Sequence, residues 1–134
     1  MKPADEWLYE YALVRFVPEP ERGEFINIGL IMMNKRKKWL KGKILINPER
    51  IKYLNSSTDI DFLKNQAKIF EKSYVPDKNL PVEVKYRWLS AVKSASLRTS
   101  PSHPGIVNVD EEDNKSYKEI MEEEFSRLFS LLVE

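Results

Sequence analysis

The first third of the chain follows the patterns of β-strands. Residues 8–17 alternate between the two faces of a strand, and Pro18 ends the pattern because proline cannot donate to a strand ladder. Residues 25–33 form a nearly continuous apolar run, typical of a strand buried on both faces. Residues 39–46 carry lysines at alternate positions, as expected when one face meets water. The pattern predicts an antiparallel three-stranded meander over residues 8–46.

The rest of the chain mostly shows the three- and four-residue spacing of amphipathic helices. We expect a turn or short helix over 48–54, helices over 59–75, 81–95 and 113–132, and short extended segments over 96–100 and 105–109. Asn47 is the expected N-cap of the first helix. The positions predicted to face the core are Trp88, Leu89 and Val92 in the third helix, and Tyr117, Met121, Phe125, Leu128 and Leu132 in the last.

These elements predict an α+β fold with an antiparallel sheet of four to five strands covered by about three helices. The chain has 134 residues and neither repeats nor a low-complexity segment, so we expect one domain over residues 1–134. Apolar runs are too short to span a membrane, and no signal peptide is recognisable, so the expected location is the cytoplasm.

The amino-acid composition limits the kinds of binding site that the chain can form. Cysteine is absent and there is one histidine, so we expect neither a metal site nor a cofactor. The acidic run at 110–113 lacks EF-hand spacing, and we interpret it as an acidic helix start that complements the helix dipole. The formal net charge of +1 argues against a dedicated nucleic-acid binder.

Polar groups gather around the connection between the first two strands. If the strands pair about the middle of this connection, Arg15 faces Asn27 and Leu13 faces Gly29. Glu24 lies within reach of Arg15, and Gly29 would leave room for another side chain or a ligand. Because a buried guanidinium needs a partner, this cluster is either a lock that fixes the hairpin register or the floor of a binding site.

A second polar cluster lies in the turn over residues 98–105, which two prolines and a glycine make rigid. Arg98, Thr99, Ser100 and His103 could together bind a phosphate or a carboxylate. Serine catalysis would need His103 as the base and a further acid, and the sequence shows no nucleophile elbow. The alternative is a histidine that only hydrogen-bonds its own loop.

The turn between the second and third strands is strongly basic. Its candidate nucleic-acid contacts are Lys35, Arg36, Lys37, Lys38 and Trp39. Such a hairpin can grip phosphates and stack a base on the tryptophan. The alternative interpretation is that lysines on an exposed strand prevent edge-to-edge aggregation.

Several of these stretches resemble the bacterial family DUF3037, a domain of unknown function. The resemblance lies in residues 11–18, 21–29, 87–89 and 98–101, with His103 and Gly105. It implies no established activity. An association of this family with HipA-like kinases implies a protein partner and an accessory or regulatory role. The polar motif residues of the family map onto Arg15, Glu24, Asn27, Arg98, Ser100 and His103.

The sequence does not identify a reaction. Our leading hypothesis is a non-enzymatic binding or regulatory module that acts through a protein partner or an anionic small ligand. One alternative is an enzyme acting on a phosphorylated or nucleic-acid substrate, with Arg15 and Arg98 binding the anion and Glu24 or His103 as acid or base. The other alternative is nucleic-acid binding through residues 34–43.

Overall fold

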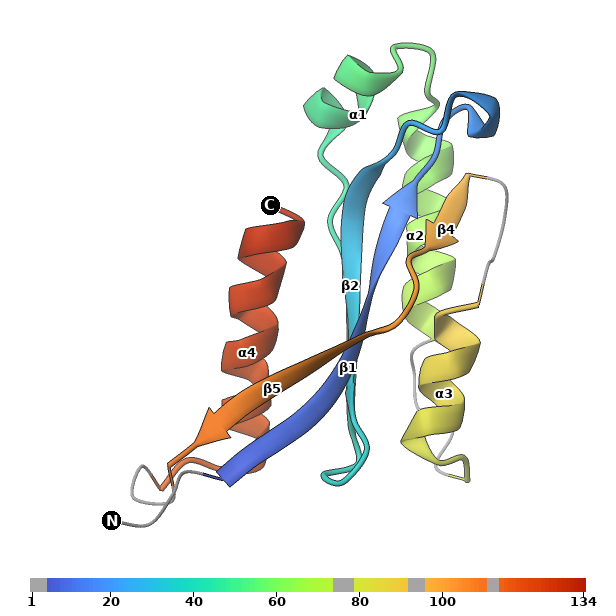
Figure 1. Cartoon of the computed structure of the whole chain (residues 1–134). Helices are drawn as coiled ribbons and strands as arrows, with labels where there is room; N and C mark the ends of the chain where they lie inside the picture. The colour runs from blue at the N-terminus through green and yellow to red at the C-terminus, as the bar shows by residue number, and fades with distance from the viewer. Residues whose placement is uncertain (1–4, 74–78, 92–95, 111–113) are drawn as a thin grey trace.

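A computed structural model of the chain describes residues 5–73, 79–91, 96–110 and 114–134 (Figure 1). In chain order the elements are β1 (Asp5–Phe16), η1 (Pro20–Arg22), β2 (Ile26–Asn34), β3 (Trp39–Ile44), α1 (Pro48–Leu54), α2 (Ile60–Ser73), α3 (Val82–Leu89), β4 (Leu97–Thr99), β5 (His103–Val109) and α4 (Tyr117–Leu132).

The five strands form one antiparallel sheet, which confirms the predicted α+β fold. The predicted meander is present, with β2 between β3 and β1. On its other side β1 pairs first with β5, along residues 5–11, and then with β4, along residues 14–16. The long strand β1 therefore joins the N-terminal meander to the C-terminal strands.

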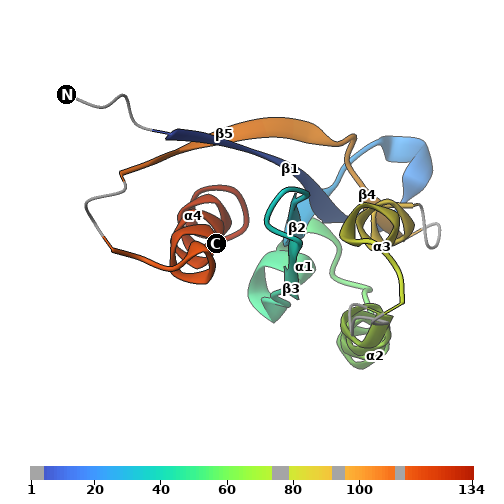
Figure 2. The same ribbon diagram turned by 90° about the horizontal axis from the view of Figure 1, so that it is seen from below.

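Helices cover both faces of this sheet, as the view from below shows (Figure 2). α4 lies against one face, and α2 and α3 lie against the other. α1 lies near the connection between β1 and β2 (Figure 1). Its start matches the prediction, because Asn47 Oδ1 accepts hydrogen bonds from the backbone N–H groups of Glu49 (3.1 Å) and Arg50 (3.4 Å).

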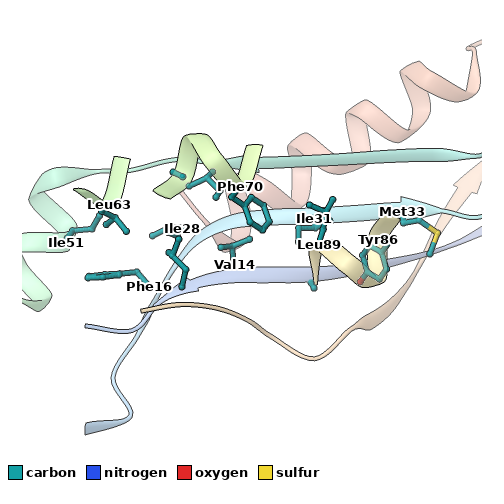
Figure 3. Packing of buried hydrophobic residues seen from close by; sticks show 14 residues of the cluster. Val14, Phe16, Ile28, Ile31, Met33, Ile51, Leu63, Phe70, Tyr86 and Leu89 are labelled. Carbon is teal, nitrogen blue, oxygen red and sulfur yellow. The ribbon is translucent and has the colours of Figure 1, made fainter. Parts of the chain in front are cut away.

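The larger hydrophobic cluster lies between the sheet and α1, α2 and α3 (Figure 3). It includes Val14, Phe16, Ile28, Ile31, Met33, Ile51, Leu63, Phe70, Tyr86 and Leu89. Each large apolar side chain buried in this way contributes roughly 1.5–3 kcal/mol before the entropic cost of ordering it.

The second cluster lies between the other face of the sheet and α4. Its strand members are Tyr9, Leu13, Leu30, Met32 and Trp39, and its α4 members are Met121, Phe125, Leu128 and Phe129. The sheet is therefore buried on both faces over much of its length, as the apolar run in β2 predicted.

Two predicted helices are shorter than expected. The helix predicted over 81–95 ends at Leu89, since the carbonyl of Ser90 accepts a hydrogen bond from Thr99 of β4. The helix predicted from 113 begins at Tyr117, where Ser116 accepts a hydrogen bond from the Glu119 N–H as the N-cap (3.3 Å).

Two residues predicted to face the core are exposed instead. Trp88 is 59% exposed, because the short α3 turns Tyr86 and Leu89 inward. Tyr117 is 38% exposed in the first turn of α4. The predicted core position Val92 and the acidic positions 111–113 lie outside the described residues.

Candidate functional site

The sheet brings Arg15, Asn27 and Arg98 into one row across three strands. Arg15 of β1 is directly opposite Asn27 of β2, as the hairpin geometry predicted. On its other side Arg15 is directly opposite Arg98 of β4. Because directly opposed residues project from the same face, two arginine side chains lie on one face of the sheet.

The rest of the predicted hairpin pairing is wrong by one residue. Gly29 is opposite Val14, and Leu13 is opposite Leu30, because a bulge places Ile28 as an extra residue in β2.

Gly29 also leaves no room for a ligand. A Cβ atom there would lie 2.8 Å from the Lys43 carbonyl oxygen and 2.9 Å from Ile44 Cγ1. The absence of a side chain at Gly29 therefore allows β3 to approach closely, so the space is taken by the Lys43 backbone and the Ile44 side chain, one of the two predicted alternatives, and not by a ligand.

Two polar atoms of the row are buried without a hydrogen-bond partner. Within the described part of the chain, Arg15 Nε and Asn27 Oδ1 are among three such side-chain atoms. The Arg15 guanidinium carbon lies 4.2 Å from the centre of the Phe25 ring, a cation–π contact that leaves Nε without an acceptor. Since buried polar groups are almost always paired, an unpaired donor beside an unpaired acceptor is a marked exception.

The C-terminal end of α4 lies next to this row. Asn27 Nδ2 donates a hydrogen bond to the Leu132 carbonyl (3.1 Å), and Arg50 of α1 donates to the Val133 carbonyl (2.5 Å). Both satisfy carbonyls at a helix end that carries partial negative charge. The amide of Asn27 is thereby held in one orientation, with its oxygen still available.

Glu24 does not belong to the row. Its carboxylate accepts a hydrogen bond from Arg22 Nε at 2.5 Å, on the exposed connection between β1 and β2. The expectation that Glu24 neutralises Arg15 is therefore wrong: a closer arginine, two residues away, takes the carboxylate.

Ser100 takes part in the hydrogen bonding of the sheet. It is 3% exposed, its N–H donates to the Leu13 carbonyl (2.8 Å), and its Oγ accepts from the Leu13 N–H (2.9 Å). The hydroxyl therefore replaces a backbone carbonyl in the ladder, between the β4 and β5 segments paired with β1. It is engaged on both sides, because it also donates to the Pro101 carbonyl (2.9 Å).

His103 lies away from Arg15. It is opposite Tyr11, and the two ring centres are 5.3 Å apart. Tyr11 and Arg15 are four residues apart in β1, about 13 Å along a strand. The second polar cluster therefore joins the first through Arg98 and not through His103, which does not lie where it could exchange a proton at Arg15.

A polar network that the sequence did not reveal lies beside His103. Ser102 Oγ lies 2.7 Å from the hydroxyl of Tyr86 and donates to Glu10 Oε1 at 3.3 Å. Arg87 lies 3.9 Å from the same Glu10 oxygen. Burial raises the pKa of Tyr86 to about 12, so its hydroxyl stays protonated as a hydrogen-bonding group at neutral pH.

The second unforeseen network joins β1 to α4. Tyr9 donates to Glu124 Oε2 (2.5 Å), while Arg127 Nε and Nη2 donate to Glu124 Oε1 (2.6 Å) and Oε2 (3.0 Å). Burial alone would raise the pKa of Glu124, but the hydrogen bonds from Arg127 and Tyr9 hold it below its usual value. Burial and the bond to Glu124 raise the pKa of Tyr9.

The basic hairpin lacks the exposed aromatic ring that the nucleic-acid prediction required. Trp39 is 8% exposed and packs edge-on against Phe125, so its ring is not free to stack a base. Lys41 and Lys43 lie over aromatic rings of α4, with Lys41 half-buried and Lys43 exposed. Lys35, Arg36, Lys37 and Lys38 are exposed at the turn.

The residues that the structure describes contain no group of three or more His, Asp or Glu side chains that could hold a metal ion. None of their helices has the length and apolar character needed to cross a membrane.

Comparison with known proteins gives one match. The sequence model of a family described as "Protein of unknown function (DUF3037)" matches residues 11–133. The chain belongs to the DUF3037 family. The match confirms the resemblance and includes Arg15, Asn27 and Arg98. No curated protein and no solved structure matches this DUF3037 chain.

Proposed function

We propose that this DUF3037 protein is a binding module that takes an anionic group, of the phosphate or carboxylate class, at Arg15, Asn27 and Arg98. The observation that carries the proposal is the buried Nε of Arg15, without a partner and directly opposite a second arginine. An anion would accept a hydrogen bond from this N–H and be attracted by the positive charge of both arginines.

The free oxygen of Asn27 narrows the ligand class. Asn27 Oδ1 is buried without a partner, and its amide nitrogen is already occupied at the end of α4. Because an amide oxygen only accepts hydrogen bonds, the ligand should carry an O–H or N–H donor beside its anionic oxygens. A protonated phosphate has this combination, whereas a sulfate does not.

Binding rather than catalysis is the function that this geometry supports. The row combines positive charge with an amide, but Glu24 is paired with Arg22 and His103 is opposite Tyr11. A regulatory role through a protein partner is compatible with the same site if the partner presents the anionic group.

A titration with inorganic phosphate, followed through the Arg15 Nε–Hε signal by NMR, tests this proposal. We expect saturable shifts at pH 6.5, and weaker binding of sulfate, which lacks the donor. Arg98→Ala should weaken phosphate binding about tenfold, the value of one charge-assisted hydrogen bond. Arg36→Ala, at the exposed turn, is the matched control and should change little.

Two outcomes would contradict the proposal. One is an Arg15 Nε–Hε signal that does not move at saturating phosphate. The other is equal weakening by Arg36→Ala and Arg98→Ala, which would mean nonspecific attraction to the basic surface. Arg15→Met separates binding from folding, because a protein that stays folded but loses phosphate binding uses Arg15 for the ligand.

A further inference from the structure

A third buried polar atom without a partner lies far from the arginine row. It is Oε1 of Gln66, on α2. α2 covers the face of the sheet that contains Phe16, whereas strand alternation places Arg15 on the α4 face. This atom therefore needs an explanation separate from the proposed anion site.

Gln66 lines an open pocket of about 300 Å³, at the small end of the range of ligand pockets. The pocket lies between the connection that follows β1, the loop between α1 and α2, and the first two turns of α2. Its lining comprises Phe16, Pro18, Glu19, Asn55, Ser57, Thr58, Asp59, Phe62, Leu63, Gln66 and Ser96.

The charged side chains in the described lining of this pocket are acidic. Among the residues that the structure describes, the lining includes the carboxylates of Glu19 and Asp59 and no lysine or arginine. Asp59 is held in place because its Oδ1 accepts a hydrogen bond from the Phe62 N–H (3.1 Å). Its carboxylate can accept further hydrogen bonds, so the pocket favours a cation.

The pocket also offers apolar surface next to these acceptors. Phe16 and Leu63 are buried, at 4% and 2% exposure, whereas Phe62 is 57% exposed. An exposed aromatic ring beside carboxylates can hold the apolar stem of a ligand and attract its charged end. An unpaired acceptor, two carboxylates and an aromatic ring together match one ligand chemistry.

We propose that this pocket binds an organic cation on an apolar stem, the chemistry of an arginine side chain. A guanidinium N–H would donate to Gln66 Oε1, with its charge near Asp59 and Glu19. Arg22 forms an ion pair with Glu24 (2.5 Å) and a longer one with Glu19 of the pocket (3.9 Å), so Asp59 is the main carboxylate left for the cation. The proposal is independent of the anion site, which lies across the sheet and has the opposite charge.

An NMR titration with N-acetyl-arginine amide tests this proposal, with the neutral isostere N-acetyl-citrulline amide as the control ligand. We expect shifts of the backbone amides that line the pocket, and weaker binding of the citrulline compound. Gln66→Glu should tighten binding about threefold to tenfold by adding a carboxylate, and Gln66→Leu should weaken it by a similar factor. Asn65→Leu, on the exposed side of α2, is the matched control.

A second titration distinguishes a polypeptide partner from a small-molecule cation. A peptide with one arginine between glycines should bind more tightly than the single amino-acid amide if the partner is a polypeptide, and equally if it is a small molecule. The proposal is overturned if citrulline binds as well as arginine, or if Gln66→Glu and Gln66→Leu have the same effect. Because Gln66 Oε1 accepts no hydrogen bond within the fold, both variants should remain folded, which amide signal dispersion verifies.

Discussion

At the residue scale, Gly105 shows how one missing side chain positions a polar network. Gly105 of β5 is directly opposite Tyr9 of β1, and a Cβ atom there would clash with Cζ of the tyrosine ring. The ring cannot simply rotate away, because its hydroxyl is bonded to Glu124. Glycine at this position is thus required for Tyr9 to lie across β5 and reach α4.

Gly105→Ala should therefore destabilise the protein by about 1–3 kcal/mol, the cost of overpacking a well-packed site. Urea unfolding measures this loss. In a Tyr9→Ala background the same change should cost much less, because the clashing ring is gone. Equal costs in both backgrounds would show that the glycine is needed for its backbone and not for the space it leaves.

At the element scale, β1 is paired on one side by two separate strands, and Ser100 joins them. The Ser100 hydroxyl accepts from the Leu13 N–H, so the ladder continues across the gap between β4 and β5. A serine that could be read as a nucleophile is therefore buried and engaged on both sides.

Ser100→Ala should cost about 1–3 kcal/mol, since it leaves the buried Leu13 N–H without an acceptor. Hydrogen exchange should show faster exchange at the Leu13 amide, together with a lower urea midpoint. Ser126→Ala, on the exposed side of α4, is the control and should change neither quantity. Unchanged protection at Leu13 would show that the hydroxyl is dispensable for the joint.

The same scale explains what the sequence could and could not predict. Strands and helices follow from local periodicity, so the meander, α1 and α2 were predictable. The pairing of Arg15 with Asn27 was also predictable, but the bulge at Ile28 was not, because the apolar run in β2 continues through it without a local signal. The end of α3 depends on a hydrogen bond from β4, which no local pattern contains.

The contacts of the candidate site could be predicted from the sequence only in part. Strand register placed Arg98 beside Arg15, and this follows from the order of strands in the sheet rather than from spacing along the chain. Glu24 was assigned to Arg15 by reach alone, and Arg22 was the closer partner. The pairing of Tyr9 with Glu124 spans 115 positions, so only the fold could reveal it.

At the scale of the whole molecule, the sheet separates two surfaces of opposite chemistry. The arginine row lies on the α4 face, and the pocket with Glu19 and Asp59 lies beside α2. α4 packs on the sheet through its apolar side chains and is also joined to β1 through the buried carboxylate of Glu124, so part of the stability of this contact depends on one charge.

This charge makes stability depend on pH in a defined direction. The folded-state pKa of Glu124 is lower than the usual 4.5, so its ionised form stabilises the fold above that pH. The stabilisation is lost as the pH falls below about 4.5 and through the folded-state pKa. Urea unfolding at a series of pH values should show that the free energy of unfolding falls more steeply with acid for the wild type than for Glu124→Gln. At pH 7 the substitution itself should cost about 2 kcal/mol, because Arg127 and Tyr9 lose a charged acceptor. Glu123→Gln is the control, since Glu123 pairs with Lys115 at an exposed position, and its profile should follow the wild type. If the Glu124→Gln profile were as steep as that of the wild type, another carboxylate would be responsible for the acid sensitivity.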